Sequence, residues 1–279
     1  MSMSYDIVTS ADEGYSRFVR ILADNCLYIF KKKLLVYDLG ISEETKTTIN
    51  ADFIKFDTNK DYQSLNSKNS IRATHKPLCI LDYFHKAQNK FLFIDADCLF
   101  THSPHFPDSD ICLTFRIYSE QTASDFSKNG IINSGVIFIN PNSNAKGDTE
   151  LLIKDWIFRC QNDPDSTDQK TLSDILQSLE QPLFPGAKLQ YKHTSISLLE
   201  SEFYNDVKCR TGTIFHFKAA SRREDKMKQY IFFSTLIKKS PATIQIYTFF
   251  NRIHLSVKIK MNPERYKERY VRELIKARL

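Results

Sequence analysis

Residues 90–100 read KFLFIDADCLF, an apolar run that ends in two aspartates separated by one residue. The nearly all-apolar residues 90–94 predict a strand buried on both faces, as the parallel strands of α/β proteins are. Ligands of such sheets collect beyond the carboxyl ends of the strands. This stretch therefore predicts both a fold class and the position of a site, directly after residue 94.

The chain before this stretch alternates between strand and helix patterns. Short β-rich runs occupy residues 5–9, 33–39 and 53–57. Apolar residues at helical spacing predict helices over residues 18–29, 42–49 and 71–87, the second capped by Ser42 and the third interrupted early by Pro77. This β-α-β-α-β-α-β order predicts an α/β domain with a mainly parallel sheet.

The second half of the chain is less regular. It predicts strands over residues 111–115, 131–140 and 213–217, and helices over residues 149–160 and 168–179. We expect a single Rossmann-like domain over residues 1–250, followed by a basic helical tail over residues 251–279.

Composition excludes several classes of protein. A chain of 279 residues with 42% hydrophobic and 26% charged residues is neither disordered nor fibrous. Its seven glycines form no G-x-G and no P-loop motif, so a bound nucleotide would have to be held without a glycine-rich cradle. The six cysteines form no C-x-x-C pair, which argues against a zinc cluster. The opening MSMSYDIV carries no signal-peptide pattern, so we expect a reduced, cytoplasmic chain.

The net charge of +6 is concentrated at one end of the chain. Residues 251–279 hold nine Lys or Arg and three Asp or Glu, and the other 250 residues hold 30 of each sign. A neutral body argues against a nucleic-acid-binding protein. The basic tail is expected to meet an anionic partner.

Asp95 and Asp97 carry the clearest chemical signal. In a regular strand both carboxylates would point to one face. Two carboxylates in a partly buried crevice need a counter-charge, and a divalent cation with oxygen ligands supplies one. Such a cation could also neutralise a diphosphate. The alternative is a solvated loop in which both aspartates cap the next element.

Three other segments could join this site. Residues 10–15 (SADEGY) follow the first strand, and His216 ends a late apolar strand, where it is either a core residue or a ligand for Mn²⁺ or a similar ion. In residues 130–140 (GIINSGVIFIN), a small and polar triplet interrupts an apolar strand and marks a bulge or a close backbone approach. Asp168 stands at the start of a predicted helix, where its side chain could be the N-cap. Capping does not explain the Gln169 that follows it.

Taken in order, these segments resemble the retaining, metal-dependent glycosyltransferases of family 8, which have the GT-A fold. The similar segments are IVTSADEGY, VYDLGIS, FLFIDADCLF, IINSGVIFIN, DQKTL and, in part, HFKAASR, and they span roughly residues 5 to 225. Each is short, but the ordered set is far more specific than any one of them.

The resemblance implies a role for each matching residue. The metal, Mn²⁺ or Mg²⁺, would be bound by Asp95, Asp97 and His216. Ala96, between the two aspartates, would belong to the same cofactor-binding turn. Ala11, Asp12 and Tyr15 would contact the uridine of a UDP-sugar, and Asn133 and Ser134 would line the sugar pocket. Gln169, with Asp168 beside it, would be catalytic at the anomeric carbon. Lys76 would lie by the diphosphate, and Lys218 would contact the leaving phosphate, with Arg222, Arg223 and Lys226 as alternatives.

The expected function is therefore metal-dependent, retaining transfer of a hexose from a UDP-sugar to a glycan acceptor, lipid-linked or at the cell surface, as in lipopolysaccharide synthesis. A helix over residues 264–279, with an apolar stripe and a basic face, would hold the enzyme peripherally on the inner face of the membrane. Packing of that helix on the body is the alternative. A non-catalytic nucleotide-binding protein acting through its tail is the alternative function, and a nucleotidyltransferase is a third.

Overall fold

The computed structural model describes residues 5–57, 75–116, 130–163, 167–218 and 223–261. Its centre is an eight-stranded sheet in the order β3-β2-β1-β4-β7-β6-β9-β8. The strands from the first half of the chain are β1 (Tyr5–Ala11), β2 (Leu34–Asp38), β3 (Ala51–Lys55) and β4 (Lys90–Ile94). These four pair in parallel, in the predicted β-α-β order.

The other half of the sheet is mixed. Its strands are β6 (Ile111–Phe115), β7 (Ile132–Ile139), β8 (Lys188–Tyr191) and β9 (Thr194–Glu200). β7 runs antiparallel to both β4 and β6, β8 runs antiparallel to β9, and β6 and β9 are parallel. Four of the seven pairings within this sheet are parallel, and the predicted α/β class is confirmed.

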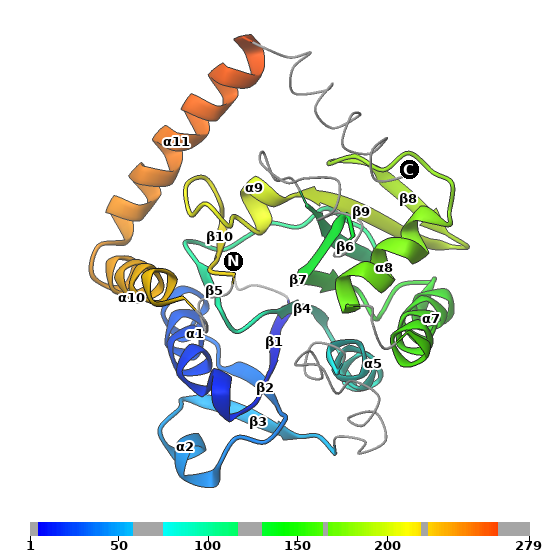
Figure 1. The fold of residues 1–279 in the computed structure, drawn as a ribbon, viewed down its shortest axis with the longest axis horizontal. Coiled ribbons are helices and arrows are strands. Elements are labelled where there is room, and N and C mark those ends of the chain that lie inside the picture. Colours follow the sequence, from blue (N-terminus) through cyan, green and yellow to red (C-terminus); the bar gives the residue numbers. More distant parts are fainter. Residues whose placement is uncertain (1–4, 58–74, 117–129, 164–166, 219–222, 262–279) are drawn as a thin grey trace.

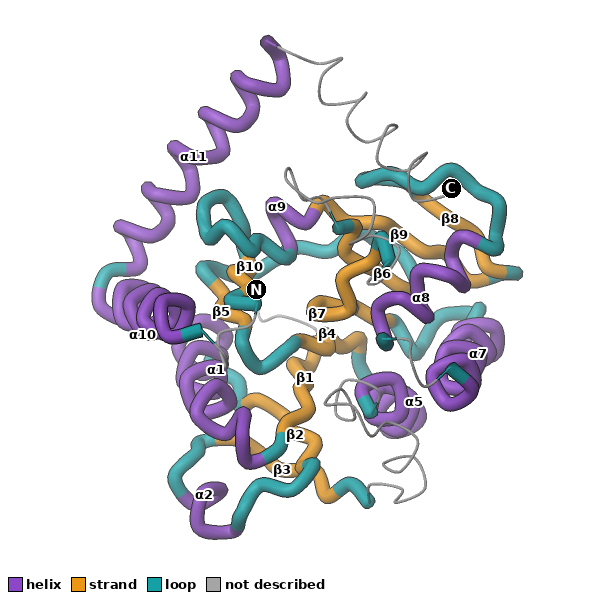
Figure 2. The backbone as a smooth tube through the Cα atoms, in the orientation of Figure 1, coloured by secondary structure: helices purple, strands orange, loops and turns teal. Residues whose placement is uncertain are grey.

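Helices cover both faces of this sheet (Figures 1 and 2). One face carries α1 (Ser16–Phe30), α10 (Glu224–Lys239) and a two-stranded sheet of β5 (Cys98–Phe100) and β10 (Ile214–His216). The other face carries α5 (Lys76–Lys86), α7 (Lys146–Asn162) and α8 (Asp168–Gln177). The short elements are η1 (Glu13–Tyr15), α2 (Glu43–Thr47) and α9 (Ser201–Tyr204). Two buried apolar clusters, one on each side of the sheet, form the core.

Local chemistry explains where two of these helices begin. The Ser42 side chain accepts a hydrogen bond from the Thr45 backbone N–H at 3.2 Å, so the predicted cap of α2 is confirmed. Pro77 lies in the first turn of α5, where the missing N–H costs nothing. Pro77 therefore suits the start of α5 at Lys76. The predicted beginning of this helix, residues 71–74, lies outside the described residues, so the interruption at Pro77 stays a prediction.

The chain continues after α10 as α11 (Pro241–Met261), which extends away from the sheet layers (Figure 1). Buried Ile244 and Thr248 hold its first turns to the body. The expected domain boundary at residue 250 falls inside this helix and stays a prediction. The predicted helix over residues 264–279 lies outside the described residues. Among the described helices, none combines the length and the apolar character needed to cross a membrane.

Candidate active site at the carboxyl edge of the sheet

Asp95 and Asp97 flank the turn that leads from β4 into β5. The Asp95 backbone N–H donates to the Gly135 carbonyl at 2.9 Å, which fixes the turn to β7. The Phe217 N–H donates to the Asp97 carbonyl at 2.9 Å, which fixes the turn to the end of β10. Neighbouring strands therefore hold both aspartates at the carboxyl end of β4, where the sequence predicts the site.

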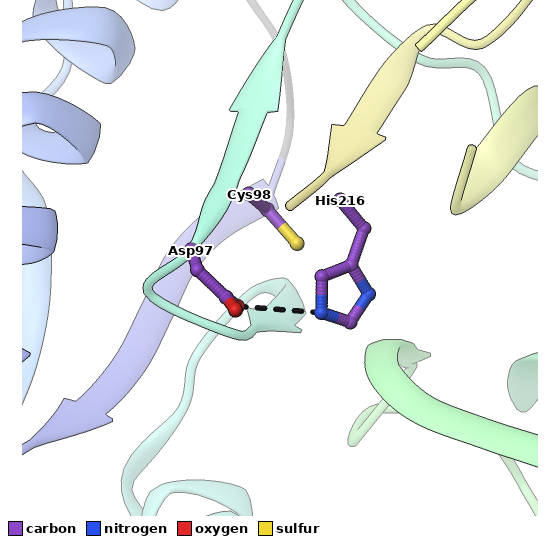
Figure 3. A group of neighbouring side chains, drawn as sticks. All are labelled: Asp97, Cys98 and His216. Atoms are coloured by element: carbon purple, nitrogen blue, oxygen red, sulfur yellow. Dashed lines mark ion pairs between the residues drawn. The ribbon is translucent and has the colours of Figure 1, made fainter. Parts of the chain in front are cut away.

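His216 lies close to both aspartates. Its Nε2 atom is 3.3 Å from Oδ1 of Asp97 and 3.9 Å from Oδ2 of Asp95. Figure 3 shows the imidazole and the Asp97 carboxylate facing each other, with the thiol of Cys98 beside them. Burial raises the pKa of Asp97, but His216, a backbone hydrogen bond and Lys76 together hold the pKa of this carboxyl below its ordinary value. The structure thus brings the three predicted metal ligands together.

Asn205 and Thr114 fix the orientation of His216. Nδ1 of His216 lies 2.6 Å from Oδ1 of Asn205, and the Asn205 amide group donates to Oγ1 of Thr114 at 3.0 Å. Thr114 in turn donates to the Asn133 carbonyl at 2.8 Å. These contacts fix the ring through Nδ1, so that Nε2 faces the aspartates. Sequence reasoning missed Asn205, because no pattern in SEFYNDVK marks it.

Gly135 makes room for this cluster. A Cβ atom at this position would lie 2.7 Å from Cε1 of His216 and 2.8 Å from Oδ2 of Asp95. The pairing of β6 with β7 also shifts register at Leu113 and Thr114. Both interpretations of the small triplet in β7, the bulge and the close approach, are therefore correct.

Lys76 joins the aspartate turn to α8. Its Nζ atom is 2.7 Å from Oδ1 of Asp95 and 3.3 Å from Oδ2 of Asp168, and it donates to Oγ of Ser134 at 3.1 Å. Ser134 donates to Asp168 at 2.5 Å. Burial lowers the pKa of Lys76, but the carboxylates of Asp168 and Asp95 more than offset it and raise the pKa above its ordinary value. Lys76 is therefore an ammonium ion between two carboxylates.

The segment expected to contact a nucleotide follows β1. Ala11 ends this strand and is buried, and Asp12 is buried beside it as the N-cap of η1. Oδ1 of Asp12 accepts from the Tyr15 backbone N–H at 3.2 Å. Because β1 pairs in parallel with β4, this segment lies at the same edge of the sheet as the aspartates. The carbonyl of Ala96 accepts from the Tyr230 hydroxyl at 3.2 Å, which anchors the turn on α10.

The remaining predicted residues differ in their surroundings. Gln169 is half-buried in the first turn of α8, which the Trp156 indole anchors by donating to the Asp168 carbonyl at 2.8 Å. Asn133 is buried, and its side chain accepts from the Gly135 N–H at 2.9 Å. Lys218 is exposed two residues after His216. Of its alternatives, Arg223 pairs with Asp225, Lys226 donates to Gln229, and Arg222 lies outside the described residues.

The donor set fits a hard divalent cation. Carboxylates with one imidazole are ligands for Mn²⁺ and related ions. Because Gly135 has no side chain, no Cβ atom fills the space beside Oδ2 of Asp95 and the His216 ring. Asp95, Asp97 and His216 would hold the ion.

A mixed α/β sheet with this cluster at its carboxyl edge is typical of GT-A glycosyltransferases, which transfer sugars from nucleotide donors. A family model described as nucleotide-diphospho-sugar transferase matches residues 41–248. Since the match covers most of the chain, the protein belongs to this family, and the predicted resemblance is confirmed. The chain is a glycosyltransferase with a nucleotide-sugar donor and a glycan acceptor as its substrates.

Several solved structures are similar to the chain. The galactosyltransferase LgtC, in complex with donor and acceptor sugar analogues, is 21% identical with a TM-score of 0.49 over 71% of this chain and 74% of LgtC. A glycosyltransferase involved in glycosylation of the major capsid of PBCV-1 is 11% identical, with a TM-score of 0.48 over 82% of this chain and 100% of that protein. The glycosyltransferase GlyE of Streptococcus pneumoniae TIGR4 is 16% identical, with a TM-score of 0.42 over 71% of this chain and 46% of GlyE. No curated protein matches significantly.

Proposed function

We propose that this glycosyltransferase moves a hexose from a UDP-sugar to a glycan acceptor, with retention of anomeric configuration and with Mn²⁺ or Mg²⁺ as cofactor. One observation carries the proposal: Asp95, Asp97 and His216 converge at the carboxyl end of β4, with Nε2 of His216 within 3.9 Å of both carboxylates. A bound divalent cation would supply the positive charge that the leaving diphosphate needs.

The donor site is supported by the edge of the sheet on which these residues lie. Ala11, Asp12 and Tyr15 follow the neighbouring strand β1, where they would contact the uridine. Lys218 is exposed two residues after His216, and it would contact the leaving phosphate. Buried Asn133 and Ser134 would line the sugar pocket. The sugar itself would therefore lie between the aspartate turn and the first turn of α8.

Gln169 is the residue proposed to act at the anomeric carbon. As UDP departs, that carbon becomes cation-like, and the amide oxygen of Gln169 can stabilise it without being a strong nucleophile. The neighbouring Asp168 is buried and committed to Lys76 and Ser134, which makes it a positioning residue and a poor nucleophile. Retention then follows from attack by the acceptor hydroxyl on the face that UDP leaves. The double displacement of a two-carboxylate glycosidase is not favoured.

Thermal unfolding with nucleotides tests the donor class. A ligand that binds only the folded state raises the apparent stability, so UDP with Mn²⁺ should raise Tm more than UDP alone, ADP or GDP. Asp97→Asn should abolish the Mn²⁺-dependent part of this shift, and Gln169→Ala should retain it while lowering kcat by about 10²-fold or more. A shift with GDP alone would replace the donor class. No shift with any nucleotide would overturn the proposal in favour of a protein that acts through its tail.

The second part of the proposal is that the enzyme docks on an anionic membrane through α11. Six large apolar side chains project from one stripe of this helix and are exposed: Ile246, Phe249, Phe250, Ile253, Val257 and Met261. The helix contains no Asp or Glu, and Lys258 and Lys260 lie near its end. An apolar stripe with basic neighbours is typical of helices that lie in a membrane interface, where they meet anionic lipids and lipid-linked acceptors.

Vesicle co-sedimentation tests this docking. We expect binding to vesicles that contain anionic lipid, weakening as salt rises, and little binding to neutral vesicles. Changing Phe249 and Phe250 to Ser should reduce binding by about tenfold or more. Phe158 and Phe184 are exposed elsewhere on the body, so their Ser variants are matched controls. Equal binding of both double variants would contradict membrane docking through α11.

A further inference from the structure

Cys98 adds a soft donor to the metal site. β5 and β10 pair antiparallel with Cys98 directly opposite His216, so the two side chains project from the same face of the small sheet. The Cys98 thiol, the Asp97 carboxylate and the His216 imidazole offer donor atoms that all lie within 4.8 Å of one another (Figure 3). All three residues are buried. This trio differs from the expected hard-ion site, which uses Asp95 in place of the thiol.

The dimensions of this trio suit a tetrahedral ion. Zinc binds carboxylate oxygen and imidazole nitrogen at about 2.0–2.2 Å, so two such ligands of one tetrahedral zinc lie about 3.3–3.5 Å apart. Oδ1 of Asp97 and Nε2 of His216 are 3.3 Å apart. The Cys98 thiol lies within 4.8 Å of both atoms and would have to move closer to them to bind the same ion. Oδ2 of Asp95, 3.9 Å from Nε2 of His216, or a water molecule can take the fourth position.

We propose that Asp97, Cys98 and His216 form a site for thiophilic divalent cations, Zn²⁺ above all, and that Cys98 makes the site prefer such ions to Mn²⁺ or Mg²⁺. When the metal–sulfur bond forms, the thiol proton passes to solvent. Thiolate selects zinc-like ions, whereas carboxylate and water ligands suit Mn²⁺ and Mg²⁺. A consequence that rests on the proposed function is competition: Zn²⁺ would displace the hard ion and inhibit transfer.

Cobalt spectroscopy on the full-length chain tests the site without any reliance on activity. Co²⁺ stands in for Zn²⁺ and reports a bound thiolate by a charge-transfer band in the near ultraviolet. We expect one Co²⁺ per chain, with this band and with the intense visible bands of tetrahedral cobalt, and Zn²⁺ should bleach both. Cys98→Ser should lose the charge-transfer band and lower Zn²⁺ affinity by about tenfold or more, while Mn²⁺ affinity changes by less than about threefold.

Matched variants separate loss of the ligand from loss of the fold. Cys160 is equally buried but lies in α7 on the far side of the sheet, so Cys160→Ser should keep the band and the Zn²⁺ affinity. If the serine variant is unstable, Cys98→Ala provides a second test. Thermal unfolding in the absence of metal shows whether each variant is folded. Visible cobalt bands without a charge-transfer band in the unaltered chain, or an unchanged band in Cys98→Ser, would overturn the proposal. If the thiolate band is present but UDP does not bind in a Mn²⁺-dependent way, the result supports this metal site and overturns the proposed function.

Discussion

The ammonium group of Lys76 lies 2.7 Å from the carboxylate of Asp95, and this buried ion pair is the link between the metal side of the site and α8. The same ammonium reaches Asp168, which opens α8 and precedes Gln169. Two carboxylates so close together would repel each other without it. Lys76 therefore joins the aspartate turn to α8 directly, beside the link through Ser134 and Gly135 of β7.

Removing this ammonium should be costly. Lys76→Met leaves the carboxylates of Asp95 and Asp168 beside an apolar side chain, and losing one partner of a buried ion pair costs about 3–5 kcal/mol of unfolding free energy. Urea unfolding measures this difference. Lys86→Met is the control, because Lys86 pairs with Asp82 at the exposed end of the same helix, and such a pair is worth about 1 kcal/mol or less. Equal losses in the two variants would show that the Lys76 network contributes little to stability.

A methyl group at position 135 should disrupt the metal site. In Gly135→Ala the new Cβ would meet His216 and Asp95 at less than 3 Å, so these ligands must move apart. We expect Mn²⁺ affinity, measured by titration calorimetry, to fall by about tenfold or more. Gly147 in α7 has no atom within 4 Å of its own Cβ position, so Gly147→Ala should leave the affinity unchanged and add about 0.4–1 kcal/mol of stability. Unchanged affinity in Gly135→Ala would argue against a metal held between His216 and Asp95.

The parts of the site that could be predicted from sequence are those with a local pattern. The apolar residues of β4 place a strand, and the aspartates that follow lie at its carboxyl end because strand direction fixes that edge. The interruption in β7 could be interpreted because glycine within an apolar strand has few structural explanations. The cap at Ser42 follows from the hydrogen-bonding needs of a helix start.

The parts that could not be predicted depend on long-range register. Cys98 faces His216 only because β5 pairs with β10, and neither strand is long enough to specify its partner by pattern. Asn205 matters because it contacts the second ring nitrogen of His216, a relationship without any sequence period. Strands β8 and β9, with the left-handed turn at Lys192 between them, were likewise not predicted. In residues 255–261 of α11, apolar and polar residues alternate as in a strand, whereas the exposed apolar residues from Ile246 onward recur at helical spacing. A short stretch of this sequence therefore predicts a strand where the structure has a helix.

Asn205 should act as a positioning residue for the metal. Removing its side chain in Asn205→Ala leaves Nδ1 of His216 without its acceptor, so the ring can rotate away from the aspartates. Loss of such an outer partner lowers metal affinity by about 10–100-fold. Asn205→Asp restores an acceptor and should recover most of the affinity, which a purely structural role would not explain. Asn162→Ala, which removes an exposed amide at the end of α7, is the control. Failure of Asp to rescue binding would refute the positioning role.

Glu202 should make stability depend on pH. Burial, with smaller contributions from Glu200 and Asp206, raises the pKa of the Glu202 carboxyl to about 7, well above its ordinary value of 4.5. The unfolded chain therefore releases this proton at lower pH than the folded chain. The contribution of Glu202 to the free energy of unfolding is therefore most favourable below pH about 4.5 and is lost progressively as the pH rises toward 7. Above pH 7 the folded chain carries the full cost of an ionised, buried carboxyl.

Replacing the carboxyl with an amide should remove this penalty. Because Glu202 is half-buried, we expect Glu202→Gln to raise the free energy of unfolding by about 1–3 kcal/mol at pH 8 and to leave it nearly unchanged at pH 4.5. Chemical denaturation at the two pH values measures both differences. Glu44→Gln, at an exposed position of α2, controls for the loss of one negative charge. A stabilisation by Glu202→Gln that is equal at both pH values would mean that packing of the amide, and not relief of a buried charge, is responsible.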